Sequence, residues 1–125
     1  MESKIRFYVC PHCGNIITKL EDSGVPVICC GEKMQEIIPN EKEAAVEKHI
    51  PVVQVKGNEL VVKVGEVAHP MTDEHSIMWI AVVTDKSCNI HFLKPGEEPM
   101  ATFKMEKDYV VYAYCNLHGL WKKES

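Results

Sequence analysis

The distribution of cysteine along the chain constrains its fold more than any other feature. Six cysteines occur among 125 residues, and four of them fall near the N-terminus, at Cys10, Cys13, Cys29 and Cys30. The segment around them is rich in proline and glycine and poor in bulky apolar side chains. A segment of this length rarely buries enough surface to fold unaided. We therefore expect a metal ion to hold residues 1–39 as a small domain, with residues 40–125 forming a second one.

The cysteine count also bears on the compartment and on possible partners. An even number of cysteines can signal a disulfide framework, but such frameworks belong to secreted proteins. The first six residues, MESKIR, contain no apolar stretch resembling a signal peptide. A reducing, cytoplasmic location is therefore expected, in which the thiols bind metal; a disulfide among them is the alternative.

No apolar run approaches the roughly 18 residues that span a bilayer, so no membrane partner is expected. The net charge of −4 gives no reason to expect a nucleic-acid partner, which would favour a basic stripe on the protein.

The first candidate site is formed by the four clustered cysteines. Cys10 and Cys13 are separated by two residues, a spacing at which a tight turn directs both sulfurs to one ion. Cys29 and Cys30 are adjacent, and both can reach the same ion only where the backbone bends sharply. Four sulfurs indicate a soft tetrahedral metal, either structural zinc or iron. Because four thiolates fill the coordination shell, His12 is interpreted as a surface residue.

One short helix is predicted, over residues 40–48. Asn40 is a good N-cap residue and lies three residues before Glu43. Two alanines and a valine follow, and Pro51 prevents the helix from continuing.

The remainder of the chain predicts an antiparallel β-sandwich. Short β-rich runs alternate with turn signals such as Gly57-Asn58 and Lys94-Pro95-Gly96. The run Ile77–Val83 is apolar at successive positions, which predicts a central strand covered on both faces. A partner subunit could supply that cover, so a homodimer is expected. The predicted strands are residues 52–56, 60–64, 77–84, 90–93, 101–105 and 109–114.

The second candidate site draws on the loops of this sandwich, where ligands can converge without disturbing the core. His49 follows the predicted helix, His69 and His75 lie between two predicted strands, and Cys115 and His118 follow the last one. A Cys-x-x-His pair suits metal binding, because the turn between the two residues directs both side chains to one ion. By itself the pair could equally be half of a zinc site, and Cys115 could be a small buried hydrophobe.

Together these segments resemble the desulfoferrodoxin family, the two-iron superoxide reductases. The resemblance runs essentially from end to end. It is carried by residues 8–15 (YVCPHCGN), 29–30 (CC), 47–52 (EKHIPV), 67–71 (VAHPM), 74–75 (EH) and 114–121 (YCNLHGLW).

The resemblance implies a mostly β fold with two iron centres. Residues 1–39 would form a desulforedoxin-like domain with iron on the four N-terminal cysteines. Residues 40–125 would form an immunoglobulin-like antiparallel β-sandwich. Its active iron would be held in a plane by His49, His69, His75 and His118, with Cys115 as the axial ligand.

The resemblance further implies an enzyme that reduces superoxide to hydrogen peroxide with electrons from a rubredoxin-like donor. No glycine-rich dinucleotide fingerprint is present, which agrees with an electron that arrives by protein contact. Lys48 would attract superoxide, and Glu47 would assist product release. A Glu-Lys pair at a helix end is otherwise typical of a solvated surface. The competing interpretations are a non-catalytic iron electron carrier and a zinc-stapled binding module.

Overall fold

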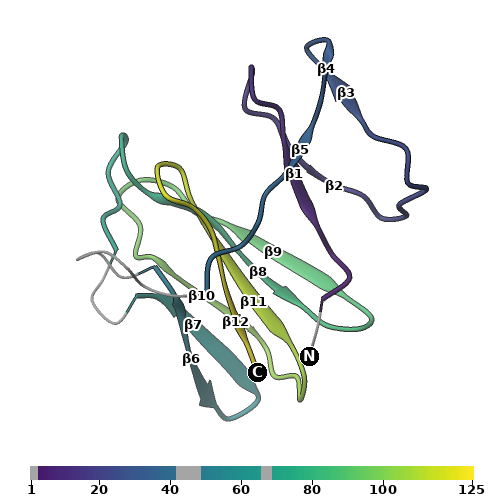
Figure 1. Ribbon diagram of the computed structural model, residues 1–125. Coiled ribbons are helices and arrows are strands. Elements are labelled where there is room, and N and C mark those ends of the chain that lie inside the picture. Colours follow the sequence, from purple (N-terminus) through teal and green to yellow (C-terminus); the bar gives the residue numbers. More distant parts are fainter. Residues whose placement is uncertain (1–2, 42–48, 66–68) are drawn as a thin grey trace. The chain divides into compact units, whose positions relative to one another are not determined.

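The chain divides into two compact units, described here separately. The computed structural model describes residues 3–41, 49–65 and 69–125, and every regular element in these ranges is a β-strand (Figure 1). One unit comprises Lys4–Ile38 and the other contains Pro39–Ser125. Within the described ranges, no helix is long and apolar enough to cross a membrane.

The N-terminal unit consists of very short strands. Strands β1 (Phe7–Val9), β2 (Ile16–Thr18) and β5 (Gln35–Glu36) form an antiparallel sheet in the order β2-β1-β5. Strands β3 (Ile28–Cys29) and β4 (Glu32–Lys33) form a separate hairpin. Among its apolar side chains, Phe7, Cys10 and Met34 are buried. So small a core agrees with the expectation that this unit depends on a metal ion.

The C-terminal unit is built from two antiparallel sheets. The first has the order β10-β7-β6, and the second has the order β12-β11-β8-β9. The predicted mostly β fold is confirmed, and each of the six predicted strands is present within two residues of its expected bounds. The seventh strand, β12, was not predicted. The bounds are β6 (Pro51–Lys56), β7 (Glu59–Val64), β8 (Ile77–Val83), β9 (Cys88–Phe92), β10 (Met100–Lys104), β11 (Val110–Cys115) and β12 (Gly119–Glu124).

A single hydrophobic core joins the two sheets. Every second residue contributes to it, as the two-residue period of a strand requires. Each fully buried Leu, Ile or Val stabilises the unit by about 1.5–3 kcal/mol relative to an exposed position. The core includes Leu60, Val62 and Val64 from β7, Ala101 and Phe103 from β10, Ile80 and Val82 from β8, and Val111, Ala113 and Cys115 from β11.

Strand β8 lies between β11 and β9, which confirms the prediction that it is a central strand. Its pairing with β11 shifts register, because Tyr114 pairs with Trp79 whereas Cys115 pairs with Ile77. Met78 is therefore the extra residue of a β-bulge, and its side chain is exposed. On the second face of β8, Trp79 is already buried within a single chain and stacks on Tyr114. The burial of this strand therefore does not require a partner subunit.

The helix predicted over residues 40–48 falls almost wholly on residues 42–48, which lie outside the described residues. Its first residue, Asn40, forms a parallel β-bridge with Trp121. The Asn40 amide donates to the Leu120 carbonyl (2.8 Å), and the Lys122 amide donates to the Asn40 carbonyl (3.0 Å). Asn40 therefore extends the edge of β12.

Candidate metal centres

The four N-terminal cysteines converge on one point. Their sulfur atoms all lie within 4.8 Å of one another. The sulfurs of Cys13 and Cys29 are 3.6 Å apart, close to the roughly 3.8 Å expected between two sulfurs bound tetrahedrally at about 2.3 Å from a metal. The Cys13 amide donates to the Cys10 sulfur (3.4 Å), and the Gly14 amide donates to the Cys10 carbonyl (3.0 Å). The first pair therefore sits in a tight turn, as its spacing predicts.

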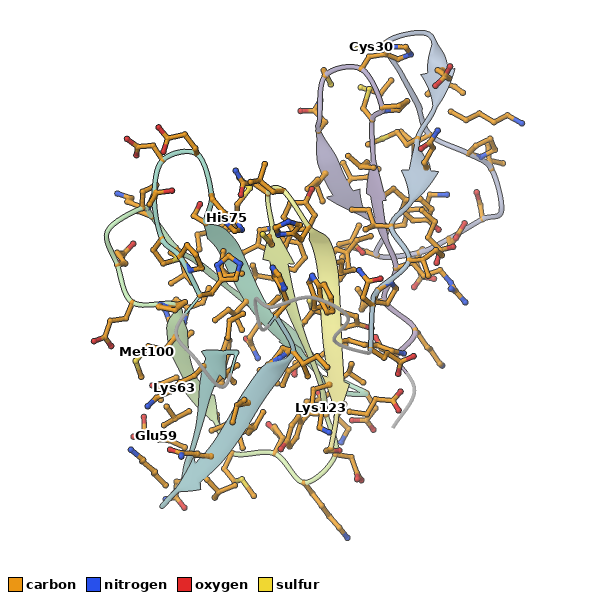
Figure 2. The ribbon with its side chains drawn as sticks, turned by 60° about the vertical axis from the view of Figure 1, so that its left-hand side comes forward. Cys30, Glu59, Lys63, His75, Met100 and Lys123 are labelled. Atoms are coloured by element: carbon orange, nitrogen blue, oxygen red, sulfur yellow. The ribbon has the colours of Figure 1, made fainter. Side chains whose placement is uncertain are left out.

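The adjacent cysteines are accommodated by a turn that connects β3 and β4. Cys29 pairs with Glu32, so Cys30 and Gly31 are the two central residues of the hairpin. Both have positive φ, 53° at Cys30 and 75° at Gly31, which is typical of a type I′ turn. A non-glycine residue in this region costs roughly 1–2 kcal/mol. Figure 2 shows Cys30 at the tip of this unit. The sharp bend predicted for the adjacent pair is confirmed.

The four thiols influence one another's ionisation. The Cys13 amide that donates to the Cys10 sulfur lowers the pKa of Cys10 to about 6. Hydrogen bonds with the Cys10 and Cys13 sulfurs raise the pKa of Cys29, and those with Cys10, Cys13 and Cys29 raise the pKa of Cys30 to about 12. One thiolate is thus favoured at the expense of its neighbours. Four thiolates at this spacing require a cation between them, and the donor set fits a soft tetrahedral metal.

His12 lies beside the cysteines but belongs to a different interaction. Its Nε2 atom is 3.5 Å from the Glu32 carboxylate, and both side chains are about half exposed. The geometry agrees with the prediction that His12 is a surface residue.

The second group brings together all five predicted donors, from four separate parts of the C-terminal unit. One atom from each of His49, His69, His75, Cys115 and His118 lies within 4.8 Å of every other. His49 precedes β6, His69 and His75 precede β8, Cys115 ends β11, and His118 lies in the turn before β12. His49, His69 and Cys115 are buried, His75 is half-buried and His118 is exposed. Figure 2 shows His75 and Glu59 toward opposite ends of the sandwich.

The four imidazole rings form a closed cycle. In the order His49, His69, His75, His118, each ring meets the next edge to face, with centroids 4.6–5.0 Å apart and planes inclined by 64–79°. The His49 Nε2 and His118 Nδ1 atoms are 3.1 Å apart. Nitrogens on opposite sides of a metal bound at about 2.1 Å would be about 4.2 Å apart, which fits inside the observed limit. The Cys115 sulfur is 3.7 Å from His118 Nδ1. Four imidazoles and a thiolate suit a five-coordinate metal better than tetrahedral zinc.

Trp121 belongs to the site although it is not among the predicted donors. Its ring stacks on His49 at a centroid distance of 4.6 Å with an interplanar angle of 13°. Its indole Nε1–H donates to the His118 carbonyl (3.2 Å). Trp121 therefore contacts two of the five residues. The sequence signal for such a role is the position of Trp121, three residues after His118. The contact of Trp121 with His49 could not be predicted in this way, because it depends on long-range folding.

Glu47 and Lys48, the two predicted catalytic residues, lie outside the described residues. They immediately precede His49 in the chain.

Comparisons with known proteins agree with this geometry. A family model described as desulfoferrodoxin matches residues 41–124. The desulfoferrodoxin of Nitratidesulfovibrio vulgaris is 44% identical over 126 residues, which covers 100% of both chains. The superoxide reductase of Thermococcus kodakarensis is 38% identical over 98 residues, which covers 62% of this chain and 85% of that protein.

A solved structure extends the likeness to both units. The crystal structure of the superoxide reductase from Treponema pallidum matches with a TM-score of 0.77 and 35% identity, covering 98% of this chain and 99% of that one. The two donor groups fit the two iron centres of the desulfoferrodoxins. The family match spans more than half of the chain and the relatives align along its whole length, so this chain belongs to the desulfoferrodoxin family.

Proposed function

We propose that the chain is a superoxide reductase, an oxidoreductase that converts superoxide to hydrogen peroxide. The observation that carries the proposal is the closed cycle of four imidazoles beside one cysteine sulfur. Relatives named superoxide reductase support it. In this proposal His49, His69, His75, His118 and Cys115 would together hold the iron, which would supply one-electron redox chemistry.

The donor set explains why superoxide would be attracted. Iron at this site would supply one electron, which together with two protons converts superoxide to hydrogen peroxide. The imidazoles are neutral and the Cys115 thiolate carries one negative charge, so a divalent ion held by them keeps a net single positive charge. The five side chains would hold the iron, and the positive charge would draw a small anion to it. The Cys115 sulfur would donate electron density to the metal.

The N-terminal unit would hold the second iron. Residues 1–39 are proposed as a desulforedoxin-like domain with iron on Cys10, Cys13, Cys29 and Cys30, and residues 40–125 as the superoxide reductase domain. A rubredoxin-like protein is the proposed electron donor. Cys13 and Cys30 are exposed, which suits electron transfer by protein contact.

Glu47 and Lys48 are proposed as the catalytic residues. Lys48 would attract superoxide, and Glu47 would assist release of the product. Steering by a whole charged cleft raises association rates by roughly 10 to 10³, so one lysine should account for about tenfold. Lys48→Ala should therefore slow the reaction with superoxide at low salt and leave the absorption spectrum intact. An unchanged second-order rate at low ionic strength would refute this role.

A homodimer and a cytoplasmic location complete the proposal. Strand β9 ends its sheet, and its Phe92 side chain is 75% exposed. A large apolar group on a terminal strand supports association with a second copy. Sedimentation of a monomer at working concentration would remove the dimer from the proposal.

The decisive test is product stoichiometry with limiting superoxide and pre-reduced protein under anaerobic conditions. Reduction yields peroxide without dioxygen, whereas dismutation yields equal amounts of both. Cys115→Ser is the matched control, because it removes the sulfur donor of this group and should abolish the absorption band of the second iron without affecting the first. A colourless protein would instead favour a zinc-stapled module. A coloured protein whose second iron is not oxidised by superoxide would favour an electron carrier.

A further inference from the structure

The side chain of Asn116 joins two of the loops that carry the candidate metal donors. Its Oδ1 atom accepts a hydrogen bond from the Ser76 amide (3.0 Å), and its Nδ2 donates to the Glu74 carbonyl (2.9 Å). Its own amide donates to the Ser76 carbonyl (3.2 Å). Asn116 therefore binds the backbone on both sides of His75, from a position directly after Cys115.

The loop around His75 is also closed internally. The Thr72 amide donates to the His75 carbonyl (2.9 Å), and the His75 amide donates to the Thr72 hydroxyl oxygen (3.1 Å). These two hydrogen bonds hold residues 72–75 in a closed turn. The bonds of Asn116 connect that turn to the one that follows β11.

The two joined loops carry neighbouring members of the imidazole cycle. The His75 ring lies 5.0 Å from the His118 ring, and His118 is two residues after Asn116. The side chain of His75 is only half-buried, so core packing fixes it less than it fixes His49 or His69. The hydrogen bonds from Asn116 to the backbone around His75 can restrict the distance between His75 and the pair Cys115 and His118.

We propose that Asn116 is a positioning residue that holds His75 in the metal site. The inference rests on the proposed function in one respect, that His75 binds the metal. Asparagine suits this role because its amide group both donates and accepts, as Glu74 and Ser76 require. Aspartate can only accept when ionised, and alanine can do neither. Groups that orient a metal ligand typically contribute 10–100-fold to metal affinity.

The test uses the full chain, reconstituted anaerobically with ferrous iron. Iron loss from the second site to a chelator is followed by the decay of its absorption band, for the native chain, Asn116→Ala and Asn116→Asp. Asn116→Ala should lose iron about tenfold faster. Asn116→Asp keeps the bond to the Ser76 amide and should lose iron at an intermediate rate. Its added negative charge would by itself retain the cation, so faster loss reports the missing bond to Glu74. Asn89→Ala, which removes another exposed asparagine from the same unit, should match the native chain.

A double-mutant cycle with His75→Ala separates positioning from general loosening. If Asn116 acts through His75, adding Asn116→Ala to His75→Ala should not accelerate iron loss further. A native rate in Asn116→Ala, or additive effects in the cycle, would overturn the inference. If Asn116→Ala does not fold, a native rate in Asn116→Asp overturns it equally. Failure of the proposed function is distinguishable, because superoxide would then not oxidise the second iron of the native chain, whereas the order of the iron-loss rates would be unchanged.

Discussion

The two units bring metal donors together by different routes. In the N-terminal unit all four sulfurs come from two short segments between Cys10 and Cys30, and few apolar side chains are buried around them. In the C-terminal unit the donors extend from His49 to His118 and converge at one end of a sandwich with a continuous core.

This difference shows how the fold of each unit contributes to its metal site. Widely separated donors can meet only on a scaffold that is already folded, and the two packed sheets provide one. Donors close in sequence can meet through local turns, so a unit with little core can assemble around its ion. We infer that metal binding is part of folding in the first unit and follows folding in the second.

Complete removal of metal should have the largest effect and should separate the units. Structural metal sites contribute roughly 10–16 kcal/mol to small domains of this kind. Residues 4–38 should therefore lose their structure, while the sandwich remains folded. Amide hydrogen exchange of β1 and β7 in the metal-free chain measures both outcomes together. Persistent protection of β1 would contradict the proposed dependence on metal.

Truncation of a core residue should have the converse effect. Leu60 is fully buried between the sheets, so Leu60→Ala should lower the free energy of unfolding of the sandwich by about 2–5 kcal/mol. The absorption of the N-terminal iron should be unchanged. Val55→Ala is the matched control, because Val55 lies on β6 of the same sandwich and is 56% exposed, and its truncation should change stability by less than about 0.5 kcal/mol. Denaturant unfolding monitored by tryptophan fluorescence measures these differences, and equal effects of both truncations would argue against the core as scaffold.

Trp121→Phe should have a smaller effect, confined to the second site. Phenylalanine can keep the stacking on His49 but cannot donate to the His118 carbonyl. The loss of one hydrogen bond should cost about 0.5–1.5 kcal/mol of sandwich stability. A shift in the absorption band of the second iron, with that of the first unchanged, would show that the indole N–H also orients His118. The thermal midpoint of each variant provides the stability control.

Gly31→Ala should have the smallest effect and should affect only the first unit. At φ of 75° an alanine is strained by roughly 1 kcal/mol, although no atom lies within 4 Å of the added Cβ. Gly31→Asn is the matched control, since asparagine tolerates this conformation better. Competition with a chelator should show faster metal loss from the first site in the alanine variant than in the asparagine variant. Equal rates would indicate that the turn conformation does not limit metal binding.

Short β-rich runs between turn signals were sufficient to predict the main strands, and the unbroken apolar run Ile77–Val83 predicted the central place of β8. Strand β12 was missed because Lys122, Lys123 and Glu124 are typical of a solvated terminus. The strand forms through pairing along the whole of β11, which is a long-range effect. The short strands of the N-terminal unit were missed because few of their residues show a regular pattern.

The residues of both candidate sites were predicted from cysteine spacing and from the resemblance of whole segments. Their arrangement was not, because the edge-to-face cycle depends on how separate loops pack. The same is true of Asn116, whose two partners lie about 40 residues away in the chain. Such residues have no spacing signal of their own. The helix expected over residues 40–48 and the roles of Glu47 and Lys48 stay predictions.

The bulge at Met78 means that this strand can change its length without turning its inward residues outward. Deleting Met78 would convert the bulge into a regular ladder, in which Trp79 still pairs with Tyr114 and Ile77 still pairs with Cys115. Ile77 and Cys115 would both keep their places in the core. A one-residue gap at this position is therefore weak evidence that a distant homologue has lost the site.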